Sequence, residues 1–266
     1  MSVYRRFLAD RVPTIRGWSF AALLLMLMTV VFFPTIRDQP SLQDAMQDMP
    51  DALKATFGVD DAVPISSPAG YLQGRLFSLV LPLALALFGI SLGARAIGGS
   101  EEDGDLELLL AQPVTRRQVA TQRFAAVLTL VIALTAVFLV LLLLLGPPFG
   151  VLDGLPLLWV AAATAGGAAL GILHGAVSFA TGAVTGRRST AIAVAAGVAG
   201  GGYVLQGLLA AANAPEWLRF ASPWHWYLRR NMLVEGIDPL SFLLPLTLAA
   251  VAVVAGLVVF ERRDLR

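Results

Sequence analysis

Six long apolar runs, separated by charged segments, dominate the pattern of hydrophobic and polar residues along the chain. Each run approaches or exceeds the ~20 residues that an α-helix needs to cross the core of a bilayer. The runs predict membrane spans at about 17–36, 76–96, 124–146, 156–185, 189–212 and 239–260. We therefore expect an all-α polytopic membrane protein, with one membrane domain over residues 1–266.

Residues 1–16 predict a short amphipathic helix before the first span. Val3 and Phe7 fall on one face at helical spacing. Arg5 and Arg6 fall on the other face, and Pro13 interrupts the pattern. A basic amphipathic helix beside a span is typical of segments that lie on the anionic leaflet of the lipid bilayer. We interpret it first as an anchor that orients the span.

The positive charges predict the orientation of the spans. An even number of spans places both termini on one side, and thirteen of the nineteen Lys and Arg residues fall on that side. The other six are Arg37, Lys54, Arg75, Arg219, Arg229 and Arg230. The positive-inside rule then places both termini in the cytoplasm. Residues 37–75 are expected to form an outer cap, with turn residues at 66–70 and a surface helix at 41–57.

The composition agrees with a membrane protein and excludes several classes of site. The chain is 57% hydrophobic and 14% charged, whereas soluble domains carry about 25% charged residues. It has no cysteine, which excludes disulfides, thiolate metal sites and cysteine nucleophiles. No basic patch carries interleaved aromatic residues, so we expect no nucleic-acid partner. We expect no metal or cofactor site in this chain.

The sequence also lacks the motifs of several enzymes and transporters. Its only lysine, Lys54, follows no glycine-rich loop, so the chain has no P-loop for ATP. Neither His-Glu-x-x-His nor Gly-x-Ser-x-Gly occurs. No predicted span carries a carboxylate in its middle, as proton- or sodium-coupled pathways do. We therefore expect that the chain is not an enzyme, and a coupled secondary transporter is disfavoured.

Glycine ridges mark the fourth and fifth predicted spans. Gly167 begins a series that repeats every four residues, and Gly197 and Gly201 have the same spacing in the fifth span. Such ridges let helix backbones approach closely. They indicate either packing within one subunit or, for Gly197 and Gly201, packing across a seam between two subunits. His174 lies in the middle of the fourth span, where we expect a neutral histidine bonded to a neighbouring helix.

The segment 97–123, between the second and third spans, is the best candidate for contact with a soluble partner. It holds five acidic residues between 101 and 107, which suit the positive end of a helix. Ser100 is expected to cap a helix over 101–111 that Pro113 ends. Thr115 and Gln118 have the capping-box spacing that starts the next helix. The predicted contacts are Glu101, Glu102, Asp105, Glu107, Leu109, Arg116 and Arg117.

The same segment resembles a known family. Residues 101–117 read EEDGDLELLLAQPVTRR, which is similar to the E-x-x-G-T-L-E-L-L-L-A-x-P-V-S-R signature of type-2 permeases of ATP-binding-cassette (ABC) exporters. Asp105 stands where the family usually has threonine, and Thr115 where serine is common. The resemblance extends to SPAGYL at 67–72, SPWHWY at 222–227 and FERRDL at 260–265, so it covers the whole chain.

This resemblance implies a permease subunit of an exporter in a bacterial or archaeal cell membrane. Two permease subunits, identical or different, would pair above two copies of a separate ATPase subunit that holds ATP and Mg²⁺. The translocation path would follow the permease seam, lined by the second and fifth spans with Pro82, Gly197 and Gly201. The helix at 101–111 would couple the ATPase to the third span, and residues 216–238 would close the path from outside. The alternatives are a channel or passive carrier without an ATPase, and a membrane anchor or assembly factor.

Overall fold

The computed structural model describes residues 2–38, 63–212 and 214–263, and these residues form helices and connecting turns with no strand. Six helices are long and apolar enough to cross a membrane, which confirms the all-α polytopic class. They are α2 (Val12–Arg37), the run Pro68–Glu102, α9 (Arg116–Leu145), α10 (Leu157–Thr185), α11 (Arg188–Ala211) and α15 (Leu240–Arg262). The surface helix expected at 41–57 lies outside the described residues.

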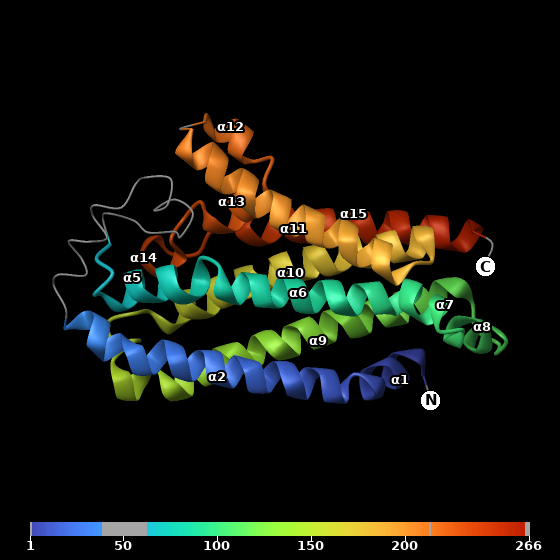
Figure 1. Ribbon diagram of the computed structural model, residues 1–266, viewed down its shortest axis with the longest axis horizontal. Helices are drawn as coiled ribbons and strands as arrows, with labels where there is room; N and C mark the ends of the chain where they lie inside the picture. The colour runs from blue at the N-terminus through green and yellow to red at the C-terminus, as the bar shows by residue number, and fades with distance from the viewer. Residues whose placement is uncertain (1, 39–62, 213, 264–266) are drawn as a thin grey trace.

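The long helices lie side by side in an elongated bundle, and consecutive helices run in opposite directions (Figure 1). Both termini therefore lie at one end, which we call the terminal end; the other is the opposite end. The short helices α1 (Val3–Asp10), α7 (Ser100–Glu102) and α8 (Asp105–Leu110) lie at the terminal end. The opposite end carries α5 (Pro68–Leu72), η3 (Pro147–Phe149), α12 (Glu216–Arg219), α13 (Pro223–Leu228) and α14 (Met232–Glu235).

The second membrane-length helix contains two π-helical segments. From its start it comprises α5, η1 (Gln73–Phe77), α6 (Val80–Ala94), η2 (Arg95–Gly99) and α7. It is longer than the predicted span at 76–96, because it begins at Pro68, before Arg75, and continues beyond Arg95 to Glu102. Long charged side chains near helix ends can reach the polar interface. Ser67, placed in a predicted turn, accepts a hydrogen bond from the Gly70 N–H at 3.1 Å and caps the start of α5.

The centre of the bundle is the contact between α6 and α10, which lie between α11 and α15 on one side and α9 and α2 on the other (Figure 1). In the run Pro68–Glu102, which contains α6, and in α10, 67% of the 18-residue apolar stretch is buried. In the other four long helices the buried share of that stretch is 17–33%. A Cβ added at Gly89 would lie 2.2 Å from the carbonyl oxygen of Gly171. A Cβ added at Gly93 would lie 2.2 Å from the carbonyl oxygen of Gly175. The glycine ridge of α10 therefore packs within the subunit.

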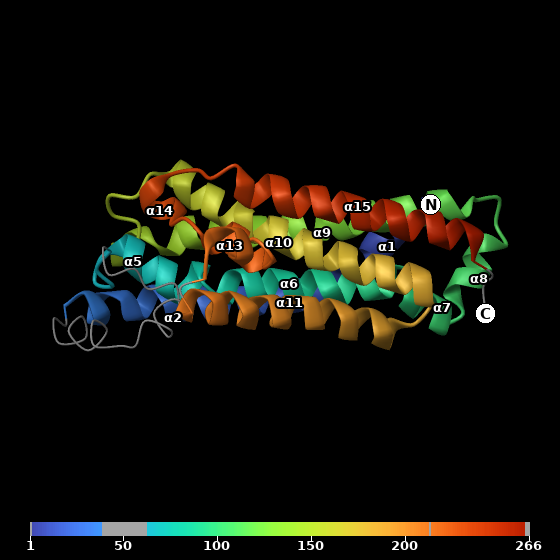
Figure 2. The ribbon, with the colours of Figure 1, turned by 90° about the horizontal axis from the view of Figure 1, so that it is seen from above.

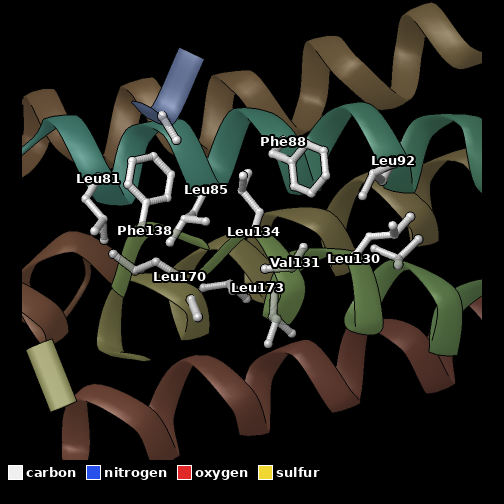
Figure 3. Packing of buried hydrophobic residues seen from close by; sticks show 14 of the residues in the cluster. Leu81, Leu85, Phe88, Leu92, Leu130, Val131, Leu134, Phe138, Leu170 and Leu173 are labelled. Carbon is white, nitrogen blue, oxygen red and sulfur yellow. The ribbon is translucent and has the colours of Figure 1, made fainter. Parts of the chain in front are cut away.

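Large side chains fill the space where α6, α9 and α10 meet. Figure 3 shows Leu85 and Phe88 of α6 beside Leu134 of α9, with Leu170 and Leu173 of α10 below them. All five are buried. Lipid tails are as apolar as leucine, so close van der Waals packing stabilises such contacts more than burial from water does.

His174 lies inside this bundle on α10 and is fully buried. Its Nδ1 is 2.8 Å from the carbonyl oxygen of Leu170, one turn earlier on the same helix. The expected bond to a neighbouring helix is therefore wrong. Among the described residues, Nε2 has no hydrogen-bond partner.

A partly buried ion pair lies at the opposite end. Two guanidinium nitrogens of Arg229 donate to the two carboxylate oxygens of Asp238, each at 2.8 Å. Burial alone raises the pKa of Asp238, but hydrogen bonds from Arg229, the Leu240 N–H and the Ser241 hydroxyl outweigh it and hold that pKa below its ordinary value. A carboxyl pKa that is lower in the folded state stabilises the fold above pH ~4 and loses that effect as the pH falls.

We predict that Gly93→Ala lowers the apparent Tm of the purified protein, because α6 would have to move away from α10. Overpacking of this kind costs roughly 1–3 kcal/mol. Thermal unfolding in detergent, followed by tryptophan fluorescence, measures the change. Gly74→Ala is the matched control, since no atom lies within 4 Å of a Cβ at that position on the same helix. Equal losses in the two variants would contradict the account of the helix crossing.

Candidate functional site

The segment 97–123, here called the terminal corner, connects the second long helix to α9 at the terminal end (Figure 1). The single helix expected over 101–111 is wrong, because α7 ends at Glu102 and α8 starts at Asp105. Gly104 separates them with a φ of 77°, a left-handed conformation that glycine adopts without strain. Ser100 does not cap a helix, since it lies inside one and its hydroxyl donates to the Arg95 carbonyl at 3.1 Å.

The corner after α8 is closed by local hydrogen bonds. The Val114 N–H donates to the Gln112 carbonyl at 2.7 Å. Thr115 then forms the predicted capping box: its side chain accepts from the Gln118 N–H at 3.2 Å, and the Gln118 side chain accepts from the Thr115 N–H at 3.1 Å. These bonds satisfy backbone groups that a free helix end would leave unpaired, so α9 has a defined start.

The leucines of α8 divide between the protein interior and its surface. Leu106 is fully buried and Leu109 is 6% exposed, whereas Leu108 is 73% exposed. Leu109 faces α1 and lines a small cavity with Phe7. The prediction of Leu109 as a partner contact is therefore wrong, and Leu108 presents its side chain outward instead.

Glu101 is bound inside the subunit. Its side chain forms an ion pair with Arg263, just beyond the end of α15, and both side chains are largely buried. A Cβ at Gly186, the left-handed residue that ends α10, would lie 2.6 Å from the Glu101 Oε1 atom. Glu101 thus joins α7 to the end of α15 and to the turn between α10 and α11, and it is not available to a partner.

Two further contacts bind the corner to the last two long helices. The Glu102 carboxylate accepts from the Arg188 N–H at 3.1 Å, at the first residue of α11, where backbone N–H groups lack intrahelical partners. The Arg116 guanidinium donates to the carbonyls of Phe260 and Arg263 at the end of α15. Arg116, also predicted as a partner contact, is therefore committed within the subunit.

The side chains that remain on the surface of the corner form a mixed charged and apolar patch. Four predicted contacts are exposed, and Leu108 joins them. We call this set the corner patch; its members are Glu102, Asp105, Glu107, Leu108 and Arg117. A large exposed leucine surrounded by charges resembles the apolar core and polar rim of a protein–protein interface.

A second open surface lies along α11, which runs along one edge of the bundle (Figure 2). No atom lies within 4 Å of a Cβ at Gly197, Gly200 or Gly201. On its other side α11 holds α13, because the Trp224 indole N–H donates to the Ala199 carbonyl at 2.8 Å. Pro82, expected on the same surface, is buried in α6 and faces α10 at Gly167, so that expectation is wrong.

A polar cavity of about 50 Å³ lies at the terminal end between α1, α8 and α9. Arg123 on α9 is 7% exposed there, and its Nη1 donates to the Ala96 carbonyl at 2.6 Å. Sequence reasoning used Arg123 only to orient the spans. The residues that line the cavity are Val3, Arg6, Phe7, Asp10, Arg11, Ser100, Asp105, Leu109 and Arg123.

The N-terminal helix covers this cavity and is attached to α9. Val3 and Phe7 are buried in the bundle, so protein rather than lipid occupies the apolar face of α1. The Tyr4 N–H donates to the Gln122 side chain at 3.1 Å, and the Tyr4 hydroxyl lies 2.9 Å from that of Thr129. Among the described residues, no group of three His, Asp or Glu side chains is placed to bind a metal ion.

Comparison with known proteins gives one family. A protein-family model described as "ABC-2 family transporter protein" matches residues 5–265. No curated protein matches the chain. The match covers all six long helices, the terminal corner and the exposed face of α11.

Proposed function

Since the chain belongs to the ABC-2 transporter family, we propose that it is the export permease of an ABC transporter, driven by two copies of a separate ATPase subunit. Permeases of this family are membrane transport components that associate with an ATPase subunit. ATP and Mg²⁺ would be held by that partner, because Lys54, the only lysine of this chain, follows no glycine-rich phosphate-binding loop. The transporter would lie in the cell membrane of a bacterium or archaeon.

The observation that carries this proposal is the exposure of Leu108 in the corner patch. A leucine 73% exposed at a polar end of the bundle leaves apolar area uncovered. Glu107 and Asp105 flank it on the exposed side of α8. A soluble subunit would seat Leu108 in an apolar pocket and place basic groups at the rim, where single ion pairs contribute only ~0–1 kcal/mol each.

The contacts behind the corner patch support a route for mechanical coupling. A displacement of α8 would reach α9 through the capped turn at Thr115. It would also reach α11 through Glu102 and α15 through Glu101 and Arg116. The sequence predicted a push on the third span alone, whereas these contacts support simultaneous movement of the third, fifth and sixth.

The charges of the terminal end support a cytoplasmic orientation. Arg5 and Arg6 on α1, Arg116 and Arg117 at the start of α9, and Arg187 before α11 all lie at this end. By the positive-inside rule this end faces the cytoplasm, where an ATPase would find its ATP. The corner patch is then on the correct side for such a partner.

The open face of α11 supports a seam with a second permease subunit, either another copy of this chain or a related one. Gly197, Gly200 and Gly201 would let a neighbouring helix approach closely, as small residues do in membrane helix pairs. Val194 and Leu208 extend the exposed face above and below these glycines. We place the translocation path along this seam, without Pro82.

We predict that Leu108→Asp weakens binding of the ATPase subunit by more than tenfold, since truncating a buried interface anchor costs ~2 kcal/mol or more. The change places a charge on an exposed side chain, so the Tm of the permease alone should stay within its experimental error. Co-purification of the ATPase at matched permease expression measures the effect.

Leu109→Ala is the contrasting variant at the next position. Leu109 is buried against α1, so this change should lower the Tm of the permease by removing core contacts worth ~2–5 kcal/mol. It should retain the ATPase at a temperature where the permease is folded. If Leu108→Asp retains full ATPase binding, the corner patch is not the docking surface.

We also predict that Gly197→Cys and Gly201→Cys each form a disulfide between two permease subunits under mild oxidation. The chain has no native cysteine, so each band on a non-reducing gel reports one position. Ala199→Cys is the matched control, because Ala199 is buried on the face of α11 that holds Trp224. Cross-linking at Ala199 and not at the two glycines would place the seam on another face of α11. If the partner is a different permease, the second cysteine is introduced in that chain.

A further inference from the structure

The cavity under α1 contains more positive charge than its acidic residues neutralise. Arg123 forms the buried floor, Arg11 is half-buried, and Arg6 is exposed at the mouth. Asp10 and Asp105 also line it. Within the described part of the chain, no ion pair of 4 Å or less joins these arginines to either aspartate, although the groups share one cavity.

Two of these guanidinium groups have unused hydrogen-bond donors. The Nε atoms of Arg11 and Arg123 are buried and have no partner among the described residues. A guanidinium has five N–H donors, and a buried donor without an acceptor costs free energy. Arg123 is 93% buried and uses only Nη1 in a protein hydrogen bond of this structure, to Ala96.

Two more arginines lie behind the cavity, beside Gly99. The Arg188 Cδ and the Arg95 Cγ would lie 3.4 and 3.5 Å from a Cβ at Gly99, the residue before the cavity-lining Ser100. The Arg188 Nε is also buried and without a described partner. Burial, and then the charge of Arg95, lower the pKa of Arg11. Arg95 and Arg188 thus act on Arg11 against the charges of Asp10 and Asp103.

We propose that this cavity binds one phosphate group, with Arg123 and Arg11 as its inner ligands and Arg6 at its entrance. Guanidinium groups bind phosphate through paired, charge-assisted hydrogen bonds, which would use the unpartnered Nε atoms. A volume of about 50 Å³ holds roughly three to five waters at ~10–15 Å³ each, which is enough space for the four oxygens of one phosphate.

The position of the cavity favours an anionic phospholipid as the source of that phosphate. Arg11 directly precedes α2, whose exposed apolar surface begins near Phe20, after the exposed Arg16. The cavity thus lies where a headgroup would meet the start of the hydrocarbon region, and basic pockets at this depth bind anionic headgroups. A free phosphate ion has the same chemistry, so the experiment must separate the two.

The test uses the full-length permease, delipidated in detergent, with thermal unfolding as the readout. The protein is titrated with short-chain phosphatidylglycerol, and a short-chain diacylglycerol, which has no phosphate, is the control. In a second titration inorganic phosphate is added, and chloride at equal ionic strength is the control. We expect phosphatidylglycerol to raise the Tm and diacylglycerol not to do so. Protection by inorganic phosphate at the same or lower concentration would identify a free ion as the source; protection by the lipid alone would identify the lipid.

Variants then locate the site. Arg11→Gln and Arg123→Gln should each raise the concentration needed for half-maximal protection by roughly tenfold to a hundredfold, as expected for a charge-assisted hydrogen-bond pair. Arg5→Gln is the matched control, since Arg5 is exposed on α1 and does not line the cavity. Asp10→Asn should tighten binding by about twofold to fivefold, because it removes a like charge at the mouth.

Three results would overturn the proposal. The first is no protection by either phosphate compound beyond its phosphate-free control. The second is an Arg5→Gln effect equal to that of Arg11→Gln. The third is unchanged or weaker binding in Asp10→Asn. If Arg123→Gln does not fold, Arg11→Gln and Asp10→Asn decide, since both change side chains closer to the surface than Arg123.

Discussion

The buried ion pair between Glu101 and Arg263 is the contact on which the terminal end of this permease depends. In the sequence, four membrane-length helices lie between Glu101 and Arg263. Burying two charges carries a desolvation cost, which good geometry and further hydrogen bonds must offset. Here the Arg116 guanidinium adds bonds to the same chain end, and Gly186 leaves the space that the Glu101 carboxylate needs. Removing one charge would leave the other buried and unpaired.

This contact connects the terminal corner to the helices of the bundle. The close crossing of α6 and α10 makes the centre of the subunit rigid, because its glycines bring backbone against backbone. The terminal corner binds this centre to the ends of α11 and α15, the long helices with the least buried apolar windows. Under the proposed function, a displacement of the corner would therefore move α11 and α15 together. In the proposed function the ATPase subunit would act on α8, where Leu108 is the most exposed leucine.

The sequence was enough to predict the helical class, the six spans and the capping box at Thr115, since these depend on local composition and spacing. It could not predict which leucine of α8 is exposed. The helix starts anew after the break at Gly104, and this break decides which of Leu108, Leu109 and Leu110 faces outward. Glu101 read as a surface acid because its partner is 162 residues away. Arg123 read as a topological charge, and only the packing of α1 over it reveals a cavity. Pro82 was assigned from the family pattern, whereas helix packing places it against α10.

If the Glu101–Arg263 pair transmits movement of the ATPase subunit to the outer helices, breaking the pair should uncouple ATPase binding from stimulated ATP hydrolysis in the reconstituted transporter. The measurement compares ATPase binding with permease-stimulated ATP hydrolysis in wild type, Glu101→Gln and the charge-swapped Glu101→Arg/Arg263→Glu variant. We expect Glu101→Gln to bind the ATPase through the corner patch but to lose most of the stimulation of hydrolysis, and we expect the charge swap to restore part of that stimulation. Wild-type stimulation in Glu101→Gln, in a folded permease with bound ATPase, would show that the pair does not transmit this movement.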